Sequence, residues 1–582
     1  MTRFPKYPLR TVHQLDGLWD FAFLGPDVDL GTLDVESITY LDKMVVPAAF
    51  DTIPPYTGLR GTVAYRRSLK VTDTLTDVQL YFEGVSLWCR VYVDGHMLAE
   101  HPWGLSPFWV QVPDSDLEER EIVVIVDNRL DFGRSPLHGE EYDFYQHGGI
   151  IRSVWWHDMP QTYIESAIVQ TDDYRTGAVT VRLRLGGYIP DMPRSANEVP
   201  ERINIFAKVD DGKQERYSFD APYPDEFVFH LTLDDPHPWS PADPFLHTLE
   251  ISAVLHMRNS DIMITRFGLR QVETRQGVII LNDEPVKLLG FNRHELTPLY
   301  GPASPDALLL ADLQRMRDMG CNFVRGAHYP QDQRFLDMCD ELGILVWEEG
   351  LGWGANTRHL TNEVYLQQHE AMLREMIAAS ANHPSVIIWG FLSESDRRSP
   401  TANEVDRATV RLLRQLDPTR LISYSGKSPL DDMSIDLVDV ISFSLFPGWY
   451  SQPGDGDLTG AVRGQIDACL RRIVSQGLDA PFMISAIGAG AIPGWHDEYE
   501  GLWSEEYQAT LIRTVVEEAL NNDRVAGLAL WQFADVRTYQ GANALRRPRG
   551  HNNQGVFDEF RRPKLASQVV KELFNAYWAS GD

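Results

Sequence analysis

Residues 386–394 read Val-Ile-Ile-Trp-Gly-Phe-Leu-Ser-Glu, a short apolar run that ends in a hydroxyl and a carboxylate. This composition is typical of a parallel strand buried on both faces. Seven similar runs occur in the same half of the chain: Val286-Lys-Leu-Leu-Gly, Asn322-Phe-Val-Arg, Ile344-Leu-Val-Trp, Leu421-Ile-Ser-Tyr, Asp439-Val-Ile-Ser-Phe, Phe482-Met-Ile-Ser and Gly527-Leu-Ala-Leu-Trp. Eight such strands with helices between them predict a C-terminal (β/α)8 TIM barrel.

Helix signals alternate with these runs. Ser304-Pro305-Asp306 predicts a helix start with Ser304 as N-cap, and Gly320 predicts its end. A doubly wound open sheet would also alternate strands and helices. However, no glycine-rich phosphate loop follows any of the runs, so we prefer the barrel.

The residues before the barrel predict two β-domains. Residues 1–160 contain short β-branched and aromatic runs such as Val78-Gln-Leu-Tyr-Phe, which favour a jelly roll. Residues 161–272 contain strictly alternating strands such as Val179-Thr-Val-Arg-Leu-Arg-Leu, which favour an immunoglobulin-like sandwich. The barrel then takes residues 273–582.

Composition limits the partners. The net charge of −30 argues against nucleic acid and against an anionic membrane surface. No apolar run reaches the roughly 18 residues of a membrane span, and no signal peptide is visible. We therefore expect a cytoplasmic protein, with a trimmed secreted chain as the alternative. The cysteines are too far apart for a metal motif, so we expect reduced thiols: Cys89, Cys321, Cys339 and Cys469.

Polar and aromatic residues follow the predicted strands, at the end where barrel enzymes place their active sites. They are Asn292, His294, Glu295, Arg325, His328, Glu348, Glu349, Trp353, Ser393, Glu394, Ser444, Phe446, Tyr450, Trp531 and Asp535, and the small residue Ala486 follows the seventh strand at the same end. Any one of them could be structural, but together they predict an active site. His294, His328 and Glu295 lack the spacing of metal ligands, so we expect neither a metal nor a cofactor.

Several longer motifs then point to one family. They are Leu15-Asp-Gly-Leu-Trp-Asp-Phe, Gly148-Gly-Ile-Ile-Arg, Asn292-Arg-His-Glu, Asn382-His-Pro-Ser-Val and Ser504-Glu-Glu-Tyr-Gln. The sequence resembles glycoside hydrolase family 2, the β-galactosidase and β-glucuronidase family, over nearly its whole length. Its size is similar to that of the compact three-domain β-glucuronidases.

The resemblance implies a retaining mechanism with two glutamates. Glu394 matches the general acid/base. The nucleophile motif Thr/Ser-Glu-x-Gly-Ala reads Ser485-Ala-Ile-Gly-Ala, so Ala486 stands where the nucleophilic glutamate is expected. A methyl group cannot attack the anomeric carbon, so we expect this chain to be inactive. A deliberate Glu→Ala replacement is the favoured origin, and a natural pseudoenzyme is the alternative.

Other positions depart from the family pattern. Ser393 replaces an asparagine that holds the sugar 2-hydroxyl, Ser444 replaces a common asparagine, and Phe446 replaces a tyrosine that contacts the nucleophile. The resemblance, with these departures included, implies a substrate-binding set: His294, Glu295, Arg325, His328, Trp353, Ser393, Tyr450, Trp531, Asn552 and Gln554.

The substrate expectation depends on Gln554. Family β-glucuronidases bind the sugar carboxylate with an Asn-x-Lys pair, but this chain has Asn552-Asn-Gln554. A neutral amide favours a terminal β-galactoside or β-glucoside. The alternatives are a β-glucuronidase or β-galacturonidase, with Arg546, Arg547 or Arg549 in place of the lysine, and a carbohydrate-binding pseudoenzyme. We interpret the three arginines as a solvated loop. The resemblance also allows a homo-oligomer, although no interface pattern is visible.

Overall fold

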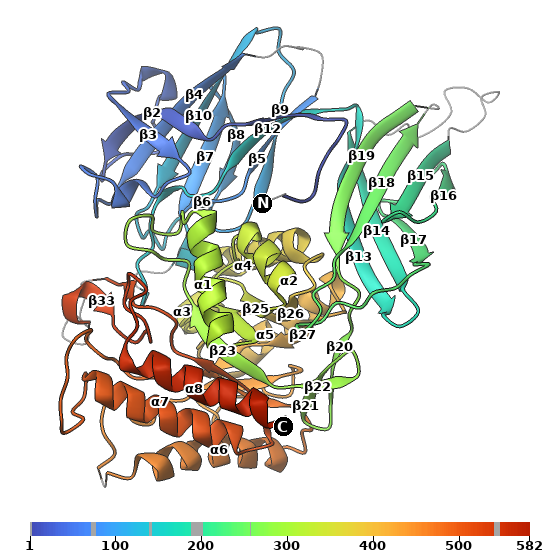
Figure 1. Cartoon of the computed structure of the whole chain (residues 1–582). Helices are drawn as coiled ribbons and strands as arrows, with labels where there is room; N and C mark the ends of the chain where they lie inside the picture. Colours follow the sequence, from blue (N-terminus) through green and yellow to red (C-terminus); the bar gives the residue numbers. More distant parts are fainter. Residues whose placement is uncertain are drawn as a thin grey trace.

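The computed structural model describes residues 3–70, 77–138, 142–187, 202–255, 258–454, 456–539 and 547–581. Two β-domains lie against a C-terminal barrel, the first domain above it and the second to one side in the view of Figure 1. The predicted multidomain fold class is confirmed.

The first domain is a sandwich of two antiparallel sheets. One has the order β3 (Asp42–Val46), β2 (Gly17–Gly25), β4 (Thr62–Lys70), β10 (Glu119–Asp127), β7 (Trp88–Val93), β8 (His96–His101). The other has the order β1 (Thr11–Gln14), β12 (Val154–Met159), β5 (Asp77–Phe82), β9 (Phe108–Val112), and β6 (Val85–Ser86) pairs with β11 (Gly149–Ile150). Trp19, Phe82 and Trp156 are among the fully buried side chains between the sheets.

The second domain is also a two-sheet sandwich. Its sheets are β13 (Thr162–Asp173), β14 (Ala178–Gly187), β17 (Phe227–Thr232), and β16 (Glu215–Asp220), β15 (Arg202–Val209), β18 (His247–Leu255), β19 (Arg258–Phe267). Burial alternates along β17, as expected of a strand with one face in the core. A small sheet of β20 (Val272–Arg275), β21 (Val278–Leu281) and β22 (Glu284–Val286) leads into the barrel.

The barrel sheet is parallel and closes on itself. Its strands are β23 (Leu288–Arg293), β24 (Phe323–Gly326), β25 (Leu345–Glu349), β26 (Val386–Gly390), β27 (Leu421–Ser423), β28 (Ser425–Gly426), β29 (Ile441–Ser444), β30 (Phe482–Ala486) and β31 (Val525–Leu530). β27 and β28 lie at the two ends of the sheet order but are separated in the chain only by Tyr424. The fifth strand is thus split between them, and the ring is complete.

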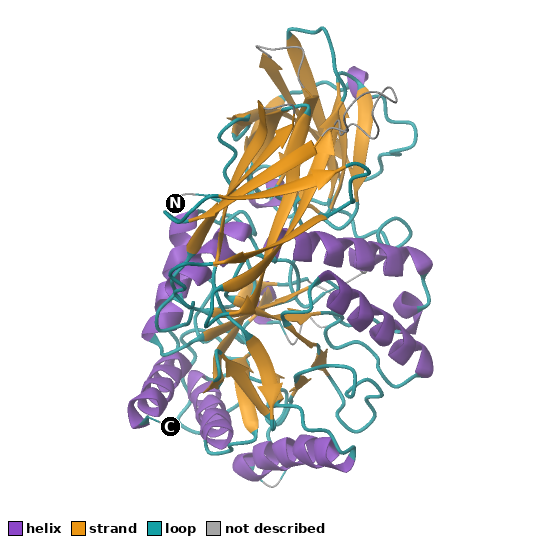
Figure 2. Ribbon diagram, turned by 90° about the vertical axis from the view of Figure 1, so that its right-hand side faces the viewer, coloured by secondary structure: helices purple, strands orange, loops and turns teal. Residues whose placement is uncertain are grey.

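Helices form the outer layer of the barrel, as Figure 2 shows. They are α1 (Asp306–Asp318), α2 (Gln333–Leu342), α3 (Thr357–Leu360), α4 (Glu363–Ser380), α5 (Pro400–Leu416), α6 (Leu458–Ser475), α7 (Glu505–Leu520) and α8 (Leu565–Ser580). The predicted cap of α1 is wrong: Pro305 occupies the N-cap, and the Ser304 hydroxyl bonds to Thr297 instead. Within the described residues, no helix is both long and apolar enough to span a membrane.

Candidate active site

The carboxyl ends of the barrel strands bring the predicted site residues to one rim. The register of β23 and β24 places Asn292 beside Arg325, and that of β29 and β30 places Ser444 beside Ala486. Asn292, Arg325 and Glu349 are fully buried. Buried polar groups need hydrogen-bond partners, and here they supply one another.

Arg325 is the centre of this polar floor. It binds both oxygens of Glu349, at 2.9 Å and 3.1 Å, and donates to Asn292 Oδ1 at 2.8 Å and to Ser393 Oγ at 2.9 Å. Burial alone would raise the pKa of Glu349, but Arg325 and His328 outweigh it and hold that pKa below its usual value. Glu349 is therefore ionised, and the charge pair fixes the floor rigidly.

Aromatic rings form a wall beside the floor. His328 stacks on Trp531 with ring centroids 5.2 Å apart, and His294 meets the same indole edge-on at 5.5 Å. Burial lowers the pKa of both histidines, so both are neutral at neutral pH. His328 Nδ1 lies 2.7 Å from the Glu349 carboxylate and carries the proton, which leaves Nε2 as an acceptor for a sugar hydroxyl.

Glu394 lies just beyond β26 at the edge of this wall. Its backbone has φ of +51°, and its amide donates to Ser425 O at 2.7 Å. A non-glycine residue in the left-handed region costs about 1 kcal/mol or more, and such strain is common where a side chain must be aimed. The Glu394 side chain is 13% exposed, whereas that of Glu349 is fully buried. Glu394 is therefore the acid that can meet a ligand entering from solvent.

Ala486, where the sequence predicts the nucleophile position, is held as firmly as the rest of the site. The Ala486 carbonyl accepts from the Leu445 amide at 2.8 Å, and the Ser485 carbonyl accepts from Asn292 Nδ2 at 2.9 Å. Ser425 Oγ links the hydroxyls of Ser444 and Ser485 at 2.9 Å and 2.7 Å. The backbone of this segment is held in place, but the methyl side chain of Ala486 cannot form a glycosyl-enzyme.

A second group of polar residues surrounds Arg547. Arg547 makes two 2.7 Å hydrogen bonds to Asp143, and Asn552 donates to the same carboxylate at 2.9 Å. The Tyr450 hydroxyl lies beside Arg547 and Gln554. Burial works against the charge of Arg547, but Asp143 raises its pKa, so the guanidinium stays charged. We call these five residues the Arg547 pocket.

The arginines predicted to form a solvated loop divide into different roles. Arg547 is only 9% exposed, so the interpretation of a solvated loop is wrong for this residue. Its burial comes from the ion pair with the first domain, which the local sequence cannot reveal. Arg549 is partly exposed and binds Glu559 at 2.9 Å. Arg546 lies outside the described residues.

The first domain contributes residues that the sequence analysis missed. The Asp143–Phe144 segment enters the mouth of the barrel, where Phe144 lies 4.6 Å from the His294 ring and Asp143 binds Arg547. The Gly148-Gly-Ile-Ile-Arg motif that follows was the only nearby signal.

Glu295, predicted to bind substrate, lies instead between the domains. One carboxylate oxygen binds Arg152 of the first domain at 2.9 Å, and the other accepts from the Asp332 amide at 2.7 Å. Glu295 is also 1% exposed. One oxygen thus joins the first domain to the barrel, and the other is used within the barrel, so neither is left for a sugar.

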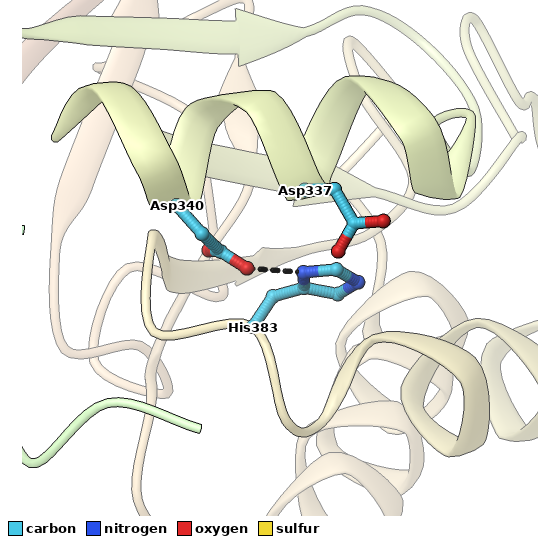
Figure 3. Close-up of side chains that lie close together, drawn as sticks. All are labelled: Asp337, Asp340 and His383. Atoms are coloured by element: carbon cyan, nitrogen blue, oxygen red, sulfur yellow. Dashed lines mark hydrogen bonds and ion pairs between the residues drawn. The ribbon is translucent and has the colours of Figure 1, made fainter. Parts of the chain in front are cut away.

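A cluster of Asp337, Asp340 and His383 has the residue types of a metal site (Figure 3). However, His383 Nδ1 lies 2.5 Å from Asp340, and His383 Nε2 lies 3.1 Å from Gln333 Oε1. Asp337 binds Arg266 of the second domain at 2.9 Å. These contacts use the ligand atoms, so the cluster is an ion-pair network that fastens the second domain to α2.

The comparison with known families now adds to this geometry. A profile described as "Glycosyl hydrolases family 2, TIM barrel domain" matches residues 272–577, more than half of the chain. The chain belongs to glycosyl hydrolase family 2. Similarity to family members covers the β-domains as well. The β-glucuronidase of Streptococcus agalactiae is 27% identical over 98% of this chain and 97% of its own, and that of Rattus norvegicus is 26% identical over 99% and 92%.

Solved structures of family 2 enzymes have the same architecture. A β-galacturonidase from Eisenbergiella tayi bound to galacturonate has a TM-score of 0.87 and 29% identity, and the match covers 98% of each chain. A β-D-glucuronidase from Dictyoglomus thermophilum has a TM-score of 0.82 and 26% identity over 98% of each chain. The family membership confirms that the protein is a glycoside hydrolase by descent, as the resemblance predicted.

Proposed function

We propose that this protein binds a terminal β-linked hexuronic acid, such as glucuronic or galacturonic acid, in an exo-acting family 2 site. The Arg547 pocket carries this proposal. Arg547 is a buried, charged guanidinium beside the hydroxyl of Tyr450, and the Gln554 Nε2 donor has no hydrogen-bond partner among the described residues. A guanidinium with neighbouring neutral donors is suited to a carboxylate.

The proposed substrate differs from the terminal β-galactoside or β-glucoside that the sequence analysis predicted from the neutral Gln554. Gln554 is neutral, and we infer that the nearby Arg547 guanidinium, which Asp143 holds in place, takes the part of the missing lysine. The relatives support the same conclusion, since they include β-glucuronidases and a β-galacturonidase bound to galacturonate. We therefore favour the β-hexuronide hypothesis over the β-galactoside and β-glucoside hypothesis.

In this proposal Glu394 is the acid/base, and a carboxylate at residue 486 would be the nucleophile. Glu394 protonates the leaving oxygen, while the second carboxylate attacks the anomeric carbon and water later releases the sugar. With Ala486 the protein binds the glycoside but leaves its glycosidic bond intact. The wall of His328 and Trp531 would stack on the sugar ring.

The test is the variant Ala486→Glu beside the unmodified protein. Both are assayed on aryl β-glucuronide, β-galacturonide, β-galactoside and β-glucoside. We expect the variant to hydrolyse one hexuronide with kcat/KM at least about a thousandfold above the unmodified chain, because a retaining enzyme without its nucleophile has no covalent route. Turnover of the neutral glycosides alone would refute the hexuronide assignment. Tight binding of a sugar by both proteins without turnover by either would favour the pseudoenzyme.

A further inference from the structure

The surroundings of Glu394 outside the sugar site point to the nature of the leaving group. A general acid must contact the oxygen of the departing group, so the residues that flank it on the solvent side border that group. Two loops do so. The Glu394 amide binds Ser425 O at 2.7 Å, and the Gly354 amide binds Ser393 O at 2.8 Å. The first contact holds the segment that carries Lys427 close to Glu394. The second holds the segment that carries Trp353 close to Ser393.

Lys427 is a cation at the mouth of the site. Its Nζ atom lies 4.0 Å from Glu394 Oε2, and its side chain is 62% exposed. Within the described part of the chain, this is the one ion pair recorded for Lys427. Such a long contact at an exposed lysine is weak, so the ammonium group is free to turn toward a second anion.

Trp353 comes directly before Gly354, whose amide binds the residue that precedes Glu394. It is partly buried against the wall, with its ring 6.1 Å from that of His328 and 6.1 Å from that of Tyr142. Gly352 and Gly354 on either side both have positive φ, so the turn that presents the indole depends on these two glycines. An indole at this place offers a flat apolar face to a sugar or aryl ring.

We propose that Lys427 makes the site selective for glycosides whose leaving group carries a carboxylate or sulfate, while Trp353 stacks on the ring of that group. This inference rests on the proposed hexuronide site and adds its second half: the substrate would be the end of an acidic glycan or a conjugate with an acidic aglycone. When the leaving group binds, its anion pairs with the ammonium group of Lys427 in place of the long contact to Glu394.

Binding to the unmodified protein tests this directly, because Ala486 keeps the ligand intact. The probes are the free hexuronic acid, its phenyl β-glycoside, and the 4-carboxyphenyl and 4-sulfophenyl β-glycosides. Calorimetry at low salt should show about threefold to fivefold tighter binding of the two charged glycosides than of the phenyl glycoside, the range of one partly exposed ion pair. High salt should reduce this preference.

Two variants identify the residue responsible. Lys427→Met should bring the ratio of charged to neutral affinities close to one, and Lys427→Arg should restore it. Lys571→Met is the matched control, since Lys571 is an exposed lysine on α8 that pairs with Asp318. It removes the same charge far from the mouth and should leave the ratio unchanged.

Equal affinities for charged and neutral glycosides, or a preference that survives in Lys427→Met, would overturn the inference. The free hexuronic acid separates this from a failure of the proposed function. If the free acid binds but the charged leaving groups bring no preference, the role of Lys427 alone is wrong. If the free acid does not bind, the hexuronide site is wrong and the inference fails with it. A preference for only one of the two anions would identify the acidic group.

Discussion

Replacing Glu348 with glutamine should stabilise the protein at and above neutral pH. Glu348 and Glu349 are neighbours on β25, but only Glu349 faces Arg325. Glu348 is fully buried on the other side, where one carboxylate oxygen accepts from the Gln331 amide at 2.9 Å. Burial raises the pKa of Glu348 to about 7. Glutamine keeps the acceptor oxygen and the shape, and removes the group that must ionise.

The sign and size of the effect follow from that pKa. In the unfolded chain Glu348 has its ordinary pKa of 4.5, so between this value and about 7 the folded state holds a proton that the unfolded state has lost. Stability therefore falls as pH rises through this window and is constant above it. Each tenfold change in acidity constant is worth about 1.4 kcal/mol, so the full loss is roughly 3 kcal/mol.

Urea unfolding at pH 5 and pH 8, followed by tryptophan fluorescence, measures the effect. We expect Glu348→Gln and the unmodified chain to be similar at pH 5, and the variant to be more stable by roughly 2 to 3 kcal/mol at pH 8. Glu498→Gln, at an exposed glutamate, is the control and should change neither value. A variant that is less stable at pH 8, or a difference that does not depend on pH, would refute the reasoning.

Two other substitutions test the site and the domain junction. In the Ala486→Glu background, Arg547→Gln should lower the ratio of hexuronide to neutral glycoside kcat/KM about tenfold or more, which is the contribution of one charge-assisted hydrogen bond. The control variant Arg549→Gln should leave this ratio unchanged. An unaltered ratio in Arg547→Gln would show that another group binds the carboxylate. Burial tends to lower the pKa of His383, but Asp340 outweighs burial and raises it. The stabilisation by charged His383 is therefore complete below its unfolded pKa of about 6.5 and is lost as pH rises through the higher folded value. His383→Gln should cost about 3 kcal/mol at pH 6 and clearly less at pH 9 by chemical unfolding, and a larger deficit at pH 9 would contradict this assignment.

The barrel and the floor of its site could be predicted from the sequence because their signals are local. Each strand is a short apolar run, and the polar residues that follow it must reach the same rim once the strands are parallel. Arg325, His328 and Trp531 follow from this rule alone. The role of Glu394 needed the family resemblance as well, since several acids follow strands.

The residues that the sequence placed wrongly depend on contacts between domains. Arg547 has no local feature that distinguishes it from a solvated arginine, because its partner Asp143 lies in another domain. Glu295 follows a barrel strand just as His294 does, yet its contact with Arg152 places it at the domain junction. No local pattern distinguishes Lys427, because the feature that sets it apart is the 4.0 Å distance from its Nζ atom to Glu394 Oε2. These contacts join residues that are distant in the chain, so local sequence patterns do not predict them.

The position of Asp143 has a consequence for how the molecule is made. Asp143 and Arg547 are separated by 404 positions in the chain. During synthesis Asp143 emerges long before Arg547, so this ion pair cannot form until Arg547 has been made and the barrel ring has closed. We therefore expect a ligand of the Arg547 pocket to bind only molecules in which both segments are present and folded. On the proposed hexuronide site, retention on an immobilised hexuronide should separate molecules that hold this ion pair from chains that are truncated or nicked, even where their individual domains are folded.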